Sequence, residues 1–306
     1  MDAAKWKPNL KIGGLNLGSE PVIDGYEGKS GAVWRVSKYF PVDDKECVDP
    51  SKVIDLTPRL RRPSTTDAPL AFSLPKGKWH LVRIGHTSTG HTNATGGGGR
   101  GLECDKFSAA AVDKQFDNWF AAIYRHAPID VARKVLTRLH VDSWEAGSQN
   151  WSSNFMDEFK KRRGYDLKPW LLLYAGVPLK SSEESEKVLR DIRLTIGDLV
   201  NDVFFSEVRR LADEYGVKLS TECVAPTMVS DGLRHYQFAD YPMGEFWLNS
   251  PTHDKPNDML DAVSGAHIYG KNVIQAEGFT EVRGTWDEHP AMLKRLLDHN
   301  YCIGIN

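Results

Sequence analysis

The sequence predicts an α/β protein whose main part is a parallel β-sheet with helical crossovers, preceded by a β-rich segment. Residues 1–105 contain short apolar runs between polar, proline- and glycine-containing stretches. Residues 106–306 instead alternate short apolar runs with amphipathic stretches of helical period, a pattern typical of parallel sheets with helical crossovers. A chain of 306 residues can form about two domains or one large barrel. We therefore expect a β-rich segment with its connecting loop over 1–105 and a barrel portion over 106–306.

Short strands and loops are expected in the first segment. Val33–Tyr39 and Val53–Leu56 are apolar runs, and Ala71–Leu74 with Trp79–Ile84 indicates a hairpin. The four glycines Gly96–Gly99 predict a flexible or tightly turned loop. Because no Gly-Lys-Ser/Thr follows them, they do not indicate a phosphate-binding loop.

Helix signals mark the second segment. Ser108 can cap a helix whose apolar face recurs with a period of 3.6 residues, and Ser152 or Ser153 can cap another helix through Arg163, closed by Gly164. Ser181 with Glu184 forms a capping-box pattern that opens a long helix to about Tyr215. The apolar face of the first helix comprises Val112, Phe116, Trp119, Phe120 and Ile123, and that of the long helix comprises Leu189, Ile192, Ile196, Leu199 and Val203.

About five strands are expected between and after these helices. The expected strands are Val135–Val141, Val217–Cys223, Asp240–Trp247, Val273–Ala276 and Tyr301–Ile305. Two further helices are expected, over Pro256–Tyr269 and His289–His299.

Composition excludes several classes of protein. Lys and Arg total 39 against 41 Asp and Glu, so the chain lacks the basic excess of a nucleic-acid binder. No apolar run approaches the roughly 18 residues of a membrane span, and the N-terminal residues contain no signal-peptide pattern. The four cysteines are far apart, so neither a disulfide framework nor a zinc site is expected. We expect no nucleic-acid or membrane partner, and the cellular location stays open.

Carboxylates follow four successive predicted strands. Asp142 and Glu145 follow the first strand, Glu222 ends the next, and Glu245 and Glu277 end the two after it. In a barrel of parallel strands, the carboxyl ends form the mouth where active sites are built. Acids that share one rim repel each other unless a cation or a shared proton relieves them. The pattern therefore indicates either paired acid/base carboxylates or a divalent metal site, whereas a single strand-end Glu would more often be solvated or ion-paired.

Aromatic and polar side chains are frequent beside these acids. Sugar rings offer C–H faces to aromatic rings and hydroxyls to carboxylates and amides, so acids with aromatics suit glycoside hydrolysis. Taken singly, however, each aromatic residue is more often part of the core, His267 is more often a structural histidine, and His140 suits core or site equally. The expected sugar contacts are Asp142, Trp144, Asn150, Trp151, Trp247 and His267, and further candidates are Gln149, Phe246, Phe279, Arg283 and Trp286.

Several motifs together resemble a known family. They are Gly101-Leu-Glu-Cys-Asp-Lys106, Asp142-Ser-Trp-Glu145 with Gln149-Asn-Trp151, Arg162-Arg-Gly-Tyr-Asp166, Gly244-Glu-Phe-Trp247, Ala266-His-Ile-Tyr-Gly-Lys271 and Ala276-Glu-Gly-Phe-Thr280. In this order they resemble the α-L-rhamnosidases of glycoside hydrolase family 106, from about Lys52 to the end of the chain.

The resemblance implies a (β/α)8-type barrel, calcium dependence and hydrolysis of terminal α-L-rhamnose with inversion. Its motifs imply that Glu145 is the general acid and Glu277 the general base, with Asp142 as an alternative in catalysis. Glu245 is then the expected contact to Ca²⁺, a hard ion that oxygen ligands suit, or to a sugar hydroxyl. Family members are longer and commonly exported, and five strands cannot close an eight-stranded barrel, so we expect an incomplete barrel.

Two alternatives stay open at this point. The chain could be a truncated, non-catalytic carbohydrate-binding or structural fragment, inactive alone and dependent on missing barrel segments or on self-association to cover its open edges. It could also be a retaining glycosidase of another barrel family. Carboxyl groups about 5 Å apart would indicate retention, and groups roughly 6.5–9.5 Å apart would indicate inversion.

Overall fold

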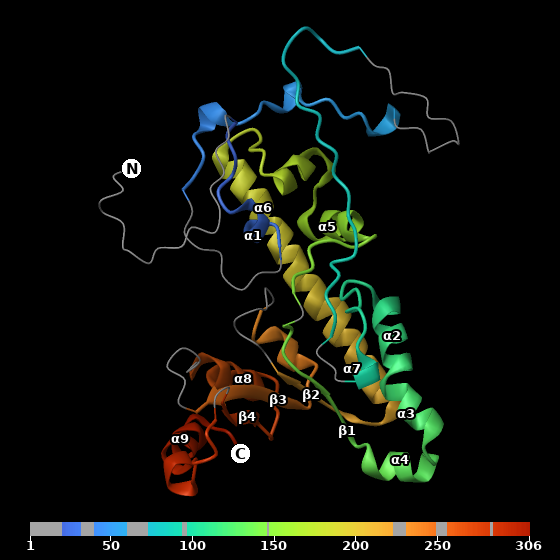
Figure 1. The fold of residues 1–306 in the computed structure, drawn as a ribbon, viewed down its shortest axis with the longest axis vertical. Helices are drawn as coiled ribbons and strands as arrows, with labels where there is room; N and C mark the ends of the chain where they lie inside the picture. Colours follow the sequence, from blue (N-terminus) through green and yellow to red (C-terminus); the bar gives the residue numbers. More distant parts are fainter. Residues whose placement is uncertain are drawn as a thin grey trace.

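The computed structural model describes residues 20–31, 40–59, 73–93, 97–145, 147–222, 231–248, 256–281 and 284–306. One long helical rod runs along the molecule and carries small helices near one end and a sheet near the other (Figure 1). No helix among the described residues is long and apolar enough to cross a membrane. Three of the cysteines, Cys47, Cys104 and Cys302, are free thiols, whereas Cys223 lies outside the described residues.

The described part of residues 20–105 contains short helices and extended chain, and no strand. Its elements are α1 (Tyr26–Lys29), η2 (Asp44–Glu46), η3 (Pro50–Lys52), η4 (Thr57–Arg59) and η5 (Gly97–Gly99). Its β-type backbone pairings are two isolated bridges, between Val48 and Leu179 and between Thr92 and Leu102. The strand expected at 79–84 is therefore wrong, and the apolar run at 53–56 forms no strand, because neither pairs with a strand among the described residues and Leu81 is 78% exposed. The predicted strand at 33–39 and residues 71–72 of the hairpin lie outside the described residues, and the boundary at residue 105 stays a prediction.

Helices and parallel strands alternate from residue 109 onward. The elements are α2 (Ala109–Asn118), α3 (Phe120–His126), α4 (Ile129–Val135), β1 (Arg138–Val141), α5 (Phe155–Arg163), η6 (Lys168–Ala175), α6 (Ser182–Leu199), η7 (Val200–Phe205), α7 (Ser206–Tyr215), β2 (Lys218–Glu222), η8 (Arg234–Gln237), β3 (Tyr241–Trp247), α8 (Pro256–Ile268), β4 (Gln275–Thr280) and α9 (Pro290–Ile303). The strands form one parallel sheet in the order β1-β2-β3-β4. The predicted α/β class is thus confirmed in its coarse form.

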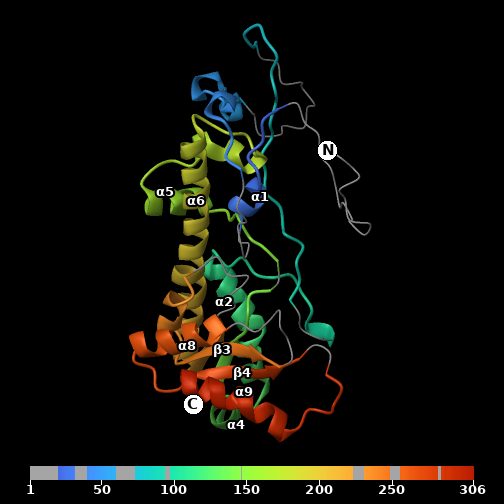
Figure 2. The same cartoon turned by 90° about the vertical axis from the view of Figure 1, so that its left-hand side faces the viewer.

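The rod is one helical run of three parts, α6, the π-helical η7 and α7. Ser181 caps it, because its Oγ accepts from the backbone N–H of Glu184 at 3.1 Å, as the capping box predicts. Gly216 ends it in the left-handed conformation, with φ at 67°. Figure 2 shows α1 and α5 beside the upper part of the rod and the strands near its lower end.

Apolar packing fixes one face of the sheet against the helices. Leu139 of β1 and Leu219 of β2 are buried with Val112 and Phe116 of α2 and with Leu211 of α7. At β3, a Cβ on Gly244 would lie 2.6 Å from the backbone carbonyl oxygen of Asp258, so only glycine lets α8 approach this closely. The opposite face of the sheet remains for polar side chains.

An ion-pair network attaches η8 to the rod. Arg162 Nη1 lies 2.5 Å from Asp202 Oδ2, and Arg163 also pairs with Asp198. Arg234 of η8 binds both aspartates. Because these groups are only partly exposed and share partners, the network holds η8 against α5 and the rod.

Some predicted elements differ from the structure, which also contains a helix that was not predicted. Residues 129–135 form α4 before the first strand, and Trp119, expected on a buried helix face, is 51% exposed because the helix breaks there between α2 and α3. The predicted strand at 301–305 is wrong: α9 continues through Ile303 and ends at Gly304. The β-branched and aromatic residues there do not override a helix that is already propagating.

Candidate active site

The strand register places four of the predicted acids on one face of the sheet. Val141 pairs with Thr221, so the following residues, Asp142 and Glu222, are neighbours. Glu245 pairs with Glu277 on the next two strands. Side chains alternate between faces along a strand, so these acids lie opposite the face that packs on the helices.

Three of these carboxyl groups converge. Asp142, Glu222 and Glu277 each offer an oxygen, and these oxygens all lie within 4.8 Å of one another. We call these three residues the carboxylate cluster. Glu222 is fully buried, Glu277 is half-buried and Asp142 is exposed. The cluster therefore extends from the interior of the sheet to the solvent-exposed surface, where a ligand can reach it.

Hydroxyl groups hold two members of the cluster. Ser143 Oγ donates to Glu222 Oε2 at 2.6 Å, and the Thr280 hydroxyl donates to Glu277 Oε1. As a carboxylate, Glu222 has no hydrogen-bond donor to its other oxygen among the described residues. The cluster thus contains a buried acceptor oxygen that needs either a proton or a cation.

The electrostatics of the cluster favour one retained proton. Burial, followed by the hydrogen bond with Asp142, raises the pKa of Glu222 from 4.5 to about 9. The same hydrogen bond lowers the pKa of Asp142. The two opposite shifts describe one proton that the pair shares and that stays mainly on Glu222 at neutral pH.

A row of polar side chains lies two residues before the cluster on the same face. His140 Nδ1 lies 3.2 Å from Ser220 Oγ, which donates to Gln275 Oε1 at 2.6 Å. His140 Nε2 lies 4.0 Å from Asp142 Oδ2. The exposed His140 ring joins the polar row to the cluster, and a role for it in the site stays a prediction.

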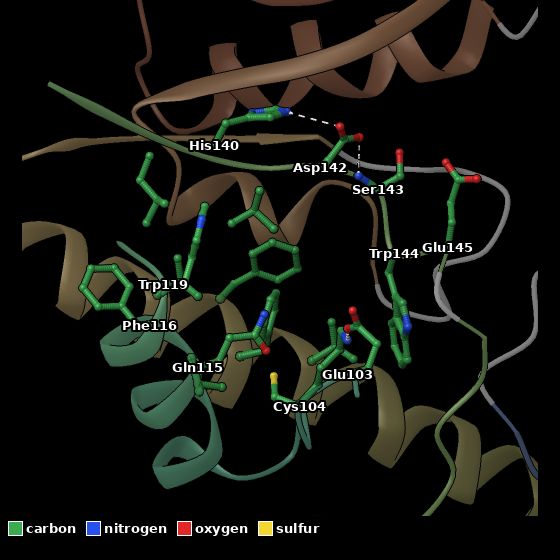
Figure 3. Close-up of a pocket in the computed structure, with 18 of the residues that line it drawn as sticks. Glu103, Cys104, Gln115, Phe116, Trp119, His140, Asp142, Ser143, Trp144 and Glu145 are labelled. Atoms are coloured by element: carbon green, nitrogen blue, oxygen red, sulfur yellow. Dashed lines mark hydrogen bonds and ion pairs between the residues drawn. The ribbon is translucent and has the colours of Figure 1, made fainter. Parts of the chain in front are cut away.

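A cavity of about 480 Å³ lies beside the end of β1. Asp142, Ser143 and Glu145 line one side of it, and apolar residues of α2 and the rod, such as Phe116 and Phe204, line the other. Figure 3 shows the carboxyl groups of Asp142 and Glu145 on the same side of the chain, whereas the Trp144 indole points away from them.

The predicted aromatic contacts separate into two groups. Trp144 is 8% exposed and belongs to the hydrophobic core, where the Lys106 ammonium lies 4.9 Å from its ring centre. Trp151 packs against this core and between the rings of His86 and Phe155. Trp247, by contrast, is half-buried at the end of β3 and pairs with Thr280, beside the cluster.

The other predicted residues occupy varied positions. Glu145 and Asn150 are exposed in the connection after β1, and His267 is exposed in the last turn of α8. Glu245 is 5% exposed, and Glu245 and Glu277 lie within strands rather than after them. The roles expected for these residues stay predictions, and Arg283 lies outside the described residues.

Sequence reasoning recognised Glu222 only as one strand-end acid and gave no role to Ser143 or Thr280. The position of Glu222 at the end of a predicted strand was the signal that marked this residue. Ser143 and Thr280 lie within two of the quoted motifs, but only the folded chain shows which carboxylate each hydroxyl reaches.

The carboxylate cluster fits a hard divalent cation. Its donor set consists of carboxylate oxygens, which suit Ca²⁺ or Mg²⁺, and the buried Glu222 oxygen without a donor is the kind of group that a cation would satisfy. A cation would also relieve the repulsion among three acids. The cluster can equally hold a shared proton for acid/base chemistry.

Carboxylates that converge at the carboxyl ends of parallel strands, with helices on the other face, define an α/β enzyme fold with its site at the sheet edge. The family model for α-L-rhamnosidases, glycoside hydrolase family 106, matches residues 2–306. The chain therefore belongs to glycoside hydrolase family 106.

The chain is also similar to two known proteins. A Formosa agariphila protein, provisionally named a beta-glucuronidase, is 34% identical over 266 residues, which cover 86% of this chain and 22% of that protein. The solved structure of a rhamnosidase from Novosphingobium sp. PP1Y superimposes with a TM-score of 0.77 at 29% identity, covering 95% of this chain and 28% of that one. The chain thus spans about a quarter of the length of each.

Proposed function

We propose that this chain provides part of the active site of a glycosidase that removes terminal α-L-rhamnosyl residues from glycans with inversion of configuration. The observation that carries the proposal is the convergence of Asp142, Glu222 and Glu277 at the carboxyl ends of the strands. Glycoside hydrolysis needs at least two carboxyl groups at one site, and the cluster together with Glu145 at the edge of the neighbouring cavity offers them. In this proposal the sheet is a portion of a (β/α)8-type barrel.

Glu145 is the proposed general acid and Glu277 the proposed general base. Glu145 lies at the edge of the cavity, where it can protonate a leaving oxygen that arrives from solvent. Glu277 is half-buried, and the Thr280 hydroxyl fixes one of its oxygens, which suits a carboxylate that must orient a water molecule. An inverting reaction needs roughly 6.5–9.5 Å between the two groups to leave room for that water.

Asp142 and Glu222 are the proposed Ca²⁺ ligands, and Glu277 lies beside them as the base. Bound Ca²⁺ would offset the negative charge of the cluster and orient sugar hydroxyls. Asp142 is exposed and can also contact the sugar directly, and Ser143 holds the Glu222 carboxyl in place. Glu245, the ligand expected from the sequence, is the neighbour of Glu277 in the register and is proposed as an additional ligand or sugar contact.

Trp247 is the aromatic residue best placed to pack on the sugar, because it pairs with Thr280 next to the cluster. Asn150 and His267 are proposed as further hydroxyl contacts from exposed positions. Trp144 and Trp151 are proposed to support the site, since core residues and other rings cover their faces.

The relative's name suggests a β-glucuronide as an alternative substrate. The family model that matches this chain is instead that of α-L-rhamnosidases. We therefore expect hydrolysis of α-L-rhamnosides and not of β-D-glucuronides.

The test compares an aryl α-L-rhamnoside with an aryl β-D-glucuronide, with and without a chelator. Proton NMR of the first product identifies inversion. Glu145→Gln and Glu277→Gln should each lower kcat by at least about 100-fold while the melting temperature stays near that of the wild type. The matched control is Glu183→Gln, on the exposed first turn of α6. If the wild type binds rhamnose, but neither it nor any variant hydrolyses the rhamnoside, the non-catalytic carbohydrate-binding alternative is favoured instead.

A further inference from the structure

The last strand contains a backbone irregularity next to the proposed base. Along the pair formed by β3 and β4, Glu245 pairs with Glu277 and Phe246 with Gly278, but Trp247 then pairs with Thr280. Phe279 is therefore an extra residue, and its φ is +63°, a left-handed conformation that non-glycine residues rarely adopt. The ladder continues afterwards, since the Leu248 N–H donates to the Thr280 carbonyl at 3.0 Å.

This bulge changes the face on which Thr280 lies. In a regular strand, side chains three residues apart point to opposite faces, so Thr280 would face away from Glu277. The extra residue restores Thr280 to the face of Glu277, where its hydroxyl donates to Glu277 Oε1.

The surrounding packing supports the bulge. The Phe279 ring meets the Phe246 ring edge-on, with centroids 5.0 Å apart. A Cβ on Gly278 would lie 2.9 Å from the Phe246 ring, so this position must stay small for Phe246 to occupy its place. Strained residues persist where their surroundings fix them, and they cluster at functional sites.

We propose that Thr280 is a positioning residue for the reaction and that the bulge at Phe279 brings the Thr280 hydroxyl to Glu277. The catalytic consequence rests on the proposed function, in which Glu277 is the base. The hydroxyl fixes one carboxylate oxygen, so that the other oxygen is directed toward the water that attacks the sugar. In this role Thr280 acts through Glu277 and needs no contact of its own with sugar or water.

The kinetic test compares Thr280→Val, which keeps the shape of the side chain and removes the hydroxyl, with Thr280→Ser, which keeps the hydroxyl. Because a hydrogen bond to a charged group is involved, kcat should fall about 10- to 100-fold in Thr280→Val, with KM within about twofold of the wild type. Thr280→Ser should recover most of this loss, which a purely structural role for the methyl group would not produce. The matched control is Thr285→Val, because the Thr285 hydroxyl also donates to a carboxylate, that of Asp287, but in an exposed segment.

A second measurement separates this inference from the proposed function. A double-mutant cycle in urea unfolding combines Thr280→Val with Glu277→Leu, and the contact should appear as a coupling of about tenfold in the unfolding equilibrium constant. This coupling requires no turnover, so it decides the contact even if the wild type hydrolyses no rhamnoside. Absence of coupling, or a Thr280→Val enzyme with wild-type kcat, would overturn the inference.

Discussion

The shared proton at Glu222 predicts an unusual pH dependence of stability for the metal-free protein. The pKa of Glu222 is about 9 in the folded chain against an ordinary value of 4.5. Between these two values the folded state holds a proton that the unfolded state has released, so the free energy of unfolding decreases as pH rises. The contribution of Glu222 to the free energy of unfolding is therefore greatest below about pH 4.5. This contribution is lost progressively as pH rises to about 9.

The magnitude follows from the size of the shift. One such proton changes the free energy of unfolding by about 1.4 kcal/mol per pH unit, so the upper bound between pH 6 and pH 8 is about 2.7 kcal/mol. Because Asp142 is exposed and admits water to the cluster, we expect about 2 kcal/mol. The lowered pKa of Asp142 affects stability only at acidic pH. The stabilisation that Asp142 contributes is lost as pH falls below 3.8, the ordinary pKa of this group.

The assay is urea unfolding in the presence of a chelator at pH 6, 7 and 8. Glu222→Gln, which carries no titratable proton and can still accept from Ser143, should not show this decrease in the free energy of unfolding over the range and should be more stable than the wild type at pH 8. Glu183→Gln, a change on the exposed surface, should follow the wild type. The same slope in Glu222→Gln as in the wild type would refute the assignment of the proton to the buried pair.

Three further outcomes are expected. Ca²⁺ at about 100 times its Kd should raise the free energy of unfolding by about 2.7 kcal/mol in the wild type and by much less in Asp142→Asn; equal calcium stabilisation of both proteins would argue against the cluster as the binding site. Gly147→Ala should cost at least about 1 kcal/mol in chemical unfolding, because φ is +76° and the new Cβ would lie 2.2 Å from the His91 ring; an unchanged midpoint would contradict this. Ser181→Ala should cost about 1 kcal/mol through loss of the helix cap, and equal stability would show that the cap contributes nothing.

Local rules predicted the helices well. The capping box at Ser181 and the glycines at 164 and 216 define their helix ends correctly, because caps and left-handed glycines act within one turn of chain. The same local rules failed for the strands expected in the first segment, since a strand needs a partner that sequence periodicity does not provide. They also failed at residues 301–305, where the preceding helix continues.

The candidate site was predictable only in outline. Acids after successive buried strands indicated a common edge, and Asp142 and Glu277 do meet there. The aromatic residues were less predictable, because Trp144 and Trp151 have the same composition signal whether they stack on a ligand or fill the core.

The sequence by itself thus determined the family, the alternation of helices and strands, and the order in which the acids arrive at the sheet edge, because these depend on motifs and on neighbours along the chain. Only the tertiary structure decided which carboxyl groups come within reach of one another and which hydroxyls hold them. Those contacts join residues as far apart as Ser143 and Glu222, and one extra residue at Phe279 is enough to turn Thr280 from one face of the sheet to the other. The spacing between residues does not reveal such a bulge, because it arises where the backbone must satisfy two strands and a packed ring at once.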